Sequence, residues 1–202
     1  MNAQACLQML RMIKDVSFAS VDKEGMPHNR MIDVMLIEDK KLYFCTARGK
    51  DFYDQITQNP HIAITGLNTD FQMIRLHGKV KQLNNPKVWI DRIFEANPVM
   101  NDVYPGDSRY ILEPFVVDNG QIEFFDLGKH PIDRQSFRLD QEVVQQHGFL
   151  ISDACIGCRT CMRNCPQQCI QSGTPYFIEQ DHCLHCGLCY ENCPVHAIDR
   201  RG

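Results

Sequence analysis

Eight cysteines near the C-terminus carry the clearest chemistry in this sequence. They occur in two copies of one spacing, Cys-x2-Cys-x2-Cys-x3-Cys-Pro. The first copy consists of Cys155, Cys158, Cys161 and Cys165, and the second of Cys183, Cys186, Cys189 and Cys193. Thiolates are soft ligands that suit iron–sulfur clusters, and this run closed by proline is the bacterial pattern for [4Fe–4S] binding. The sequence therefore predicts two [4Fe–4S] clusters and one-electron transfer.

Two other uses of a cysteine-dense segment fit this spacing less well. A disulfide framework is typical of exported proteins, and the first residues, MNAQACLQMLRMIKD, lack a basic start followed by an apolar run. Structural zinc sites usually take two ligand pairs that are separated by a long spacer. Two compact four-cysteine runs match a cluster motif better than either alternative.

The cysteine tail repeats itself with a period of 28 residues. The segment CIGCRTCMRNCPQQCI at 155 returns as CLHCGLCYENCPVHAI at 183, which marks a duplicated unit. Cys169 occupies the position that Ala197 occupies in the second copy, so we expect it to be a small buried residue and not a ligand. Three histidines lie among the motif residues, and we expect them at surface or sulfur-neighbouring positions: His182, His185 and His196.

The tail resembles a bacterial two-cluster ferredoxin over essentially all its length. In such ferredoxins the fourth cysteine of each run serves the other cluster. The resemblance therefore implies that one cluster is held by Cys155, Cys158, Cys161 and Cys193, and the other by Cys183, Cys186, Cys189 and Cys165.

The uneven use of cysteine also marks a domain boundary. Of the eleven cysteines among 202 residues, nine follow residue 150. A tail this short cannot build much apolar core, and metal clusters supply the missing stabilisation. We expect one domain at 1–127, a polar linker at 128–145 and a cluster domain at 146–202.

Short alternating segments dominate the N-terminal part of the chain. Helices are expected at 1–15, 50–58 and 86–96, and a polar loop at 101–108. Between them the pattern predicts strands at 16–21, 29–37, 41–46, 61–67 and 71–83, followed by 110–117 and 121–126, which form a hairpin across Asp118-Asn119-Gly120. Many short strands joined by short turns favour a small antiparallel barrel.

Charge and hydropathy exclude some partners. The formal net charge is −4, and lysine and arginine are scattered without a basic stripe, which argues against nucleic-acid binding. No stretch approaches membrane-spanning length. We expect a cytoplasmic protein without a membrane partner.

Residues 16–127 resemble the pyridoxamine 5′-phosphate oxidase-like family. The resemblance rests on the order of VSFASV, a Pro-x-x-Arg strand, LYFCT, a lysine-bearing turn, NPHIAI and the strand FQMIRLHGKVKQL. It implies a six-stranded split barrel that binds FMN at a homodimer interface. The namesake oxidase has a lysine where Met35 stands here, and the Arg75-Leu76-His77 triplet lies in mid-barrel, so oxidation of a B6 vitamer is not expected.

An anionic cofactor also suits the residues themselves. Lys50 opens a predicted helix, whose N-terminus offers free N–H groups and a positive dipole end. By resemblance the FMN phosphate lies near Lys50, Arg48 and Arg30. The other implied FMN-binding residues are Met31, Ile32, Phe44, Cys45, Thr46 and Gln72. No general acid is assigned, and the candidates are His28, Cys45 and Tyr104.

The two halves together predict a flavin and iron–sulfur oxidoreductase that reduces a small molecule. Flavins carry paired electrons and can link one-electron and two-electron chemistry. One alternative is an electron carrier or redox sensor that exchanges electrons with a protein partner and has no small substrate. Another is a split barrel that binds haem or a deazaflavin.

Overall fold

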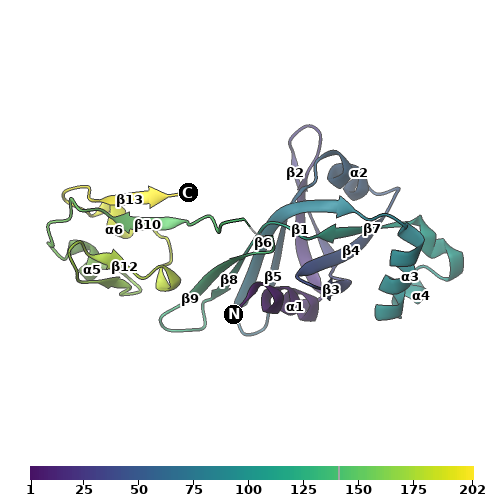
Figure 1. Ribbon diagram of the computed structural model, residues 1–202, viewed down its shortest axis with the longest axis horizontal. Helices are drawn as coiled ribbons and strands as arrows, with labels where there is room; N and C mark the ends of the chain where they lie inside the picture. The colour runs from purple at the N-terminus through teal and green to yellow at the C-terminus, as the bar shows by residue number, and fades with distance from the viewer. Residues whose placement is uncertain (141) are drawn as a thin grey trace. The chain divides into compact units, whose positions relative to one another are not determined.

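The computed structural model describes residues 1–140 and 142–202, which form two compact units (Figure 1). The first unit comprises Met1–Thr69, Met73–Glu123 and Ser136–Glu142. The second comprises Asp70–Gln72, Phe124–Gln135 and Val143–Gly202. The cysteine tail therefore forms one unit with two short pieces of chain that precede it.

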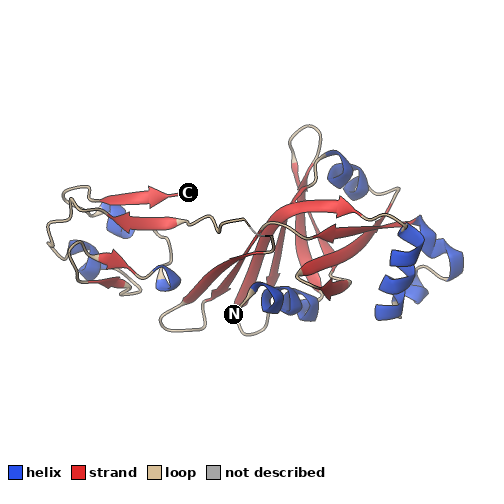
Figure 2. Cartoon of the chain, viewed as in Figure 1, coloured by secondary structure: helices blue, strands red, loops and turns tan. Residues whose placement is uncertain are grey.

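An antiparallel sheet that curls into a half-barrel dominates the N-terminal part of the described chain (Figure 2). Its main path runs β2-β1-β5-β6-β7-β4-β3, and β8 pairs with both β6 and β9. The strands are β1 (Asp15–Val21), β2 (Pro27–Asp33), β3 (Leu36–Glu38), β4 (Lys41–Ala47), β5 (His61–Leu67), β6 (Gln72–Gln82), β7 (Leu112–Val117), β8 (Gln121–Asp126) and β9 (Asp133–Arg138). The predicted antiparallel barrel is confirmed.

Aromatic side chains fill the middle of this barrel. Phe44 lies with its ring centroid 5.0 Å from that of Phe18 and 5.5 Å from that of Phe115. Helix α1 (Ala3–Ile13) begins after Asn2, whose side chain accepts a hydrogen bond from the N–H of Ala5 at 2.8 Å. Its Leu10 is fully buried. The predicted N-terminal helix is thus a covering element of the barrel core.

The backbone of β6 and the turn between β7 and β8 approach so closely that glycine is required at two positions. A Cβ at Gly78 would lie 2.4 Å from the carbonyl oxygen of Asn119, and Gly120 has φ +110°. The side-chain Oδ1 of Asn119 also accepts a hydrogen bond from the backbone N–H of Lys79 at 2.9 Å. Gly78 therefore lets the turn between β7 and β8 rest on β6.

Three sequence expectations need correction. The strand expected at 29–37 is divided into β2 and β3, because β2 pairs with β1 whereas β3 pairs with β4. The loop expected at 101–108 contains α4 (Met100–Val103) and the 3₁₀ helix η1 (Gly106–Ile111). The linker expected at 128–145 contains β9, a strand of half-buried polar residues that shows no apolar alternation.

Two further helices flank the barrel sheet. Helix α2 (Asp51–Gln58) follows β4, and helix α3 (Pro86–Ala96) follows β6. Both were expected from their spacing of apolar residues, and both bury one face: Phe52 and Ile56 in α2, and Ile90 and Ile93 in α3. No helix within residues 1–140 or 142–202 is long and apolar enough to cross a membrane.

The cysteine tail folds as two small halves. Strands β10 (Gly148–Ile151) and β13 (Ile198–Arg201) pair with each other, and so do β11 (Ile170–Gln171) and β12 (Phe177–Ile178). Helices α5 (Thr160–Asn164) and α6 (Leu188–Glu191) occupy equivalent places in the two repeats, and the 3₁₀ helix η2 (Gln180–His182) precedes the second cysteine run. The buried cluster of this unit contains cysteines together with Phe149, Ile151, Ile170, Ile178 and Ile198.

Candidate cofactor sites

Two cavities in the tail collect the eight motif cysteines. One has about 330 Å³ of empty space and is lined by Cys155, Cys158, Cys161 and Cys193. The other has about 340 Å³ and is lined by Cys183, Cys186, Cys189 and Cys165. The fourth cysteine of each run thus lies with the three leading cysteines of the other run. This is the grouping that the ferredoxin resemblance implies.

The loops around these cavities share one backbone path. Within the first two x2 segments, Gly157 and Arg159 have φ of +68° and +67°, and their counterparts His185 and Gly187 have φ of +57° and +84°. These left-handed residues turn the chain back on itself after each cysteine. The side chains of three successive cysteines can therefore converge on one space.

Backbone N–H groups point at the motif sulfurs. Ala197 donates to the Sγ of Cys193 at 3.2 Å, and His185 donates to the Sγ of Cys183 at 3.4 Å. Such hydrogen bonds stabilise negative charge on thiolates and tune cluster potentials. Sulfur donors, apolar walls and backbone N–H groups together fit a [4Fe–4S] cluster in each cavity.

An arginine contacts His185, which belongs to the second cysteine run. The Nη1 of Arg134 lies 2.9 Å from the Nδ1 of His185, and its guanidinium lies 4.6 Å from the centre of the Phe125 ring. Arg134 belongs to β9, which sequence analysis assigned to a linker. Its signal was one of two arginines in a polar segment, which spacing alone does not distinguish from a solvated surface charge.

A cleft on the barrel brings together five of the predicted FMN-binding residues. It has about 880 Å³ of empty space, open to solvent, and includes Arg30, Met31, Ile32, Thr46 and Lys50. It also includes His28, Gly49, Asp51, Phe52 and Gln55, of which sequence analysis had named His28 as a candidate acid. The cleft is thus built by β2, the end of β4, the turn that follows and the start of α2.

Hydrogen bonds hold Arg30 in place on one wall. Its guanidinium donates to the Oγ of Ser20 at 2.6 Å and to the Oε1 of Gln55 at 2.8 Å. It also lies 4.5 Å from the centre of the Phe52 ring. Burial lowers the pKa of Arg30 and nearby Asp51 opposes that shift. The cation is therefore held by neutral acceptors and an aromatic face, so it can serve an anionic ligand.

The cleft lining also contains a buried hydroxyl. Thr46 is 2 % exposed, and its Oγ1 has no hydrogen-bond partner among the residues that the structure describes. An unpaired buried hydroxyl is costly, and a polar ligand in the cleft would relieve that cost. This atom is the best evidence that the cleft accepts a polar molecule.

The start of α2 completes the cleft with mixed charge. Lys50 is the N-cap, and no described side chain caps the helix. Its first N–H groups and the Lys50 ammonium suit a phosphate. Asp51 in the first turn also lines the cleft, and its carboxylate would repel an anion. The cations Lys50 and Arg30 outnumber this carboxylate within the cleft lining.

Four of the expected FMN-binding residues lie elsewhere. Phe44 lies on the same face of β4 as Thr46 but is fully buried among barrel aromatics. Cys45 packs on the other face against residues of α3, and burial raises the pKa of its thiol to about 12. It is therefore a protonated core thiol at neutral pH. Arg48 pairs with the Oε1 of Glu113 at 2.6 Å, and Gln72 donates to the Oδ2 of Asp126 at 3.0 Å.

The remaining acid candidates differ in position. His28 lies in the cleft, with its Nε2 2.8 Å from the Oδ2 of Asp22. Hydrogen bonding to His28 lowers the pKa of Asp22. Tyr104 packs beside the apolar face of α3, in the cluster that contains Ile90 and Phe94. The 86–108 segment therefore covers the Cys45 face of β4.

The cleft residues that the sequence did not identify come from α2 and the turn before it. Phe52 and Gln55 are three positions apart on α2 and so lie on one helix face, and Gly49 belongs to the turn before that helix. A helical projection of 50–58 would have placed Gln55 beside Phe52. The contact of Gln55 with Ser20 at 2.7 Å required the tertiary structure.

Two protein-family models match different parts of the chain. Residues 3–101 match the family model of pyridoxamine 5′-phosphate oxidase, and residues 154–197 match that of the 4Fe–4S dicluster domain. No curated protein matches the chain in sequence.

Solved structures show the same barrel. A NimC/NimA family protein from Clostridium acetobutylicum is 23 % identical with a TM-score of 0.59, covering 68 % of this chain and 92 % of that one. A C. acetobutylicum protein related to general stress protein 26 of B. subtilis, of the pyridoxinephosphate oxidase family, is 13 % identical with a TM-score of 0.53, covering 68 % and 97 %.

A heme binding protein from Mycobacterium smegmatis is 12 % identical with a TM-score of 0.50, covering 67 % and 58 %. At these identities the similarity concerns the fold, and the family models identify the two domains. Residues 3–101 belong to the pyridoxamine 5′-phosphate oxidase family, and residues 154–197 form a 4Fe–4S dicluster domain.

Proposed function

We propose that this protein is a flavin and iron–sulfur oxidoreductase, which passes electrons between two [4Fe–4S] clusters and FMN to reduce a small molecule. The observation that carries the proposal is the grouping of the motif cysteines into two cavities of four, in one chain with a cationic barrel cleft. Clusters supply single electrons and a flavin supplies paired electrons or hydride.

The tail residues hold and tune the clusters. Cys155, Cys158, Cys161 and Cys193 hold the first cluster, and Cys183, Cys186, Cys189 and Cys165 hold the second. The N–H groups of Ala197 and His185 donate to cysteine sulfurs, which favours the thiolate form. Arg134 adds positive charge beside the second site through His185.

The cleft residues bind and orient FMN. Lys50 and the uncapped start of α2 receive the phosphate. Arg30 supplies a second cation, which Ser20 and Gln55 hold in place. Thr46 contributes a hydroxyl to the polar part of the cofactor. His28 is the proton donor that the cleft offers to a substrate, and Asp22 orients its ring.

The active form is a homodimer with FMN between subunits, as the family resemblance implies. Met31 lines the cleft and is 62 % exposed in the single chain. An apolar side chain beside a ligand site is a typical interface contact. A partner subunit would cover Met31 and exclude water from the cleft.

Reduction of small acceptors by matched preparations tests this function. The anaerobic protein carrying clusters and FMN is compared with the same protein stripped of FMN, using dithionite as electron source and a panel of small oxidised acceptors. We expect at least one acceptor to be reduced by the FMN-loaded protein and not by the stripped protein. Restoring FMN should restore that rate.

Two results would overturn the proposal in different ways. Equal rates with and without FMN would remove the flavin from the reaction. If no small acceptor is reduced while a redox protein is, the chain is an electron carrier. An absorption spectrum with a haem Soret band, or without flavin bands, would assign the cleft to another group.

A further inference from the structure

The two cluster cavities differ by one cysteine. The first cavity is lined by the four motif cysteines, whereas the second is lined by its four motif cysteines and Cys169. Cys169 is 2 % exposed and belongs to the buried cluster of the tail. The sequence predicts a small buried residue at this position, and the burial of Cys169 is confirmed. Cys169 nevertheless lines the same cavity as the four cysteines that are the proposed cluster ligands.

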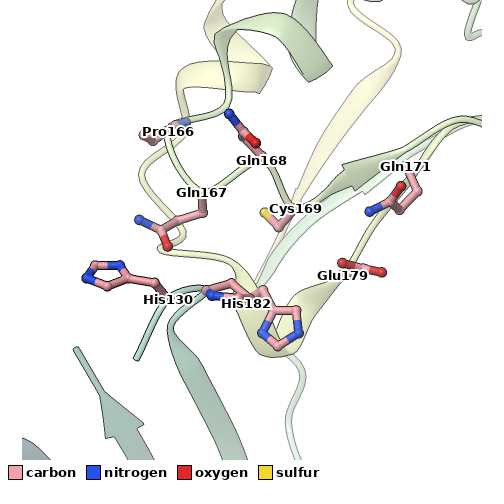
Figure 3. Close-up of a pocket in the computed structure, with 9 residues that line it drawn as sticks. His130, Pro166, Gln167, Gln168, Cys169, Gln171, Glu179 and His182 are labelled. Atoms are coloured by element: carbon pink, nitrogen blue, oxygen red, sulfur yellow. The ribbon is translucent and has the colours of Figure 1, made fainter. Parts of the chain in front are cut away.

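Cys169 lies directly beside one of the motif cysteines. Its Sγ is 3.5 Å from the Sγ of Cys165, and it lines the same cavity as Cys183. It borders a second, outer pocket with polar walls, where it lies among Gln168, Glu179 and His182 (Figure 3). Cys169 thus separates the cluster cavity from a pocket of about 820 Å³.

The first cluster provides an internal comparison. Gln168 and His196 have the same φ of +52°, so the turn that presents Cys169 also presents Ala197. At Ala197 the backbone N–H donates to the sulfur of Cys193 at 3.2 Å. The repeat thus places a thiol near Cys165 where it places a methyl group near Cys193.

We propose that Cys169 is a reserve ligand of the second [4Fe–4S] cluster, able to take the place of Cys165. The inference rests on the proposed cluster ligands. With Cys165 bound, the Cys169 thiol donates a hydrogen bond to its sulfur. In the exchange an iron–sulfur bond forms at Cys169 as the bond to Cys165 breaks. The proton that Cys169 loses passes to the Cys165 thiolate, and no electron is transferred.

Iron content of anaerobically purified full-length variants tests the exchange. The matched pair is Cys165→Ala and Cys193→Ala, which remove equivalent ligands from the two clusters. We expect about eight iron atoms per chain in Cys165→Ala, as in the unaltered protein, and about four in Cys193→Ala. The double variant Cys165→Ala/Cys169→Ala should also fall to about four.

Introducing a cysteine at the equivalent position of the first cluster tests the same geometry by a gain of iron instead of a loss. Adding Ala197→Cys to Cys193→Ala should restore about eight iron atoms per chain. The single variant Cys169→Ala should keep about eight, because Cys165 then remains bound. These two variants also show whether the tail folds when its cysteines are changed.

Each outcome decides one question. If Cys165→Ala loses as much iron as Cys193→Ala, the reserve role is wrong. If Cys169→Ala alone loses about four iron atoms, Cys169 is a resting ligand and the proposal also fails. If the unaltered protein holds far fewer than about eight, the proposed function fails before the exchange is reached.

Discussion

The cysteine cavities and the barrel cleft are two kinds of candidate site. Each cavity takes its ligands from two short runs of sequence, whose spacing and left-handed turns make the sulfurs converge. The cleft takes its residues from two strands, a turn and a helix. A site built by local spacing can be read from the sequence, whereas a site built by tertiary packing can be read only in part.

The two sites also differ in what their ligands would do for stability. The tail has a small core made largely of cysteines, so bound clusters should contribute directly to its folding. The barrel has an aromatic core of its own around Phe44. We therefore expect the tail to depend on its cofactor and the barrel to be stable without one.

Removing a cluster ligand should have the largest effect. We expect Cys189→Ala to lose about four of about eight iron atoms per chain and to expose the tail to proteolysis. The measurement is iron content together with limited digestion, and Cys45→Ala in the barrel serves as the cysteine control. A Cys189→Ala protein with full iron content would contradict the ligand assignment, because the reserve role proposed for Cys169 concerns the position of Cys165.

Reversing charge in the cleft should affect FMN without affecting iron. We expect Lys50→Glu to weaken FMN binding by about 100-fold, roughly 3 kcal/mol, because a phosphate would lose an ammonium and meet a carboxylate. Titration of FMN into the flavin-free protein measures this. Lys79→Glu, an exposed position on β6, is the charge-matched control. Equal affinity in the two variants would place the phosphate elsewhere.

A change outside both sites should alter stability alone. Asp140 accepts hydrogen bonds from Arg138 at 2.7 and 2.8 Å and from the N–H of Gly120 at 2.9 Å. Hydrogen bonding to Arg138 lowers the pKa of Asp140 from 3.8 to about 2. A lowered carboxyl pKa stabilises the fold above pH ~4 and loses that effect as pH falls through about 2.

Asp140→Asn should therefore lower the free energy of unfolding by about 1 kcal/mol at neutral pH, because solvent screens part of the interaction. The difference between the variant and the unaltered protein should shrink as the pH falls below about 4. Urea unfolding followed at several pH values gives the result, with iron and FMN content unchanged. A difference that is independent of pH would show that the carboxylate charge is not the cause.

The smallest expected effect concerns the buried hydroxyl of the cleft. Thr46→Val keeps the shape of the side chain and removes an Oγ1 that lacks a partner among the described residues. FMN affinity should fall by about fivefold, roughly 1 kcal/mol, while the flavin-free barrel should be as stable as before or more so. Unchanged affinity would mean that the hydroxyl does not meet the cofactor.

The sequence predicted the fold class and much of each candidate site. Apolar alternation predicted most strands, cysteine spacing identified the eight motif cysteines, and the ferredoxin resemblance implied the groups that line the two cavities. In the barrel, the family resemblance implied Lys50 and Arg30, and the position of Lys50 at a predicted helix start supported it. Both line the same cleft.

The rest depended on packing that spacing does not encode. Cys45 lies on the face of β4 opposite to Thr46, because side chains alternate along a strand, and so it is outside the cleft. Phe44 shares the face of Thr46 but is buried against Phe18 and Phe115. Strand β9 was missed because its polar residues are all half-buried. Cys169 was read as filler because the repeat has alanine at its counterpart, and its distance to Cys165 could not be known.

The central claim is that one chain holds paired iron–sulfur clusters and a flavin. Iron, sulfide and FMN counted per chain in anaerobically purified protein test it most directly. The account predicts about eight iron atoms, about eight sulfides and about one FMN. Zinc in place of iron, about four iron atoms, or iron without any flavin would contradict it.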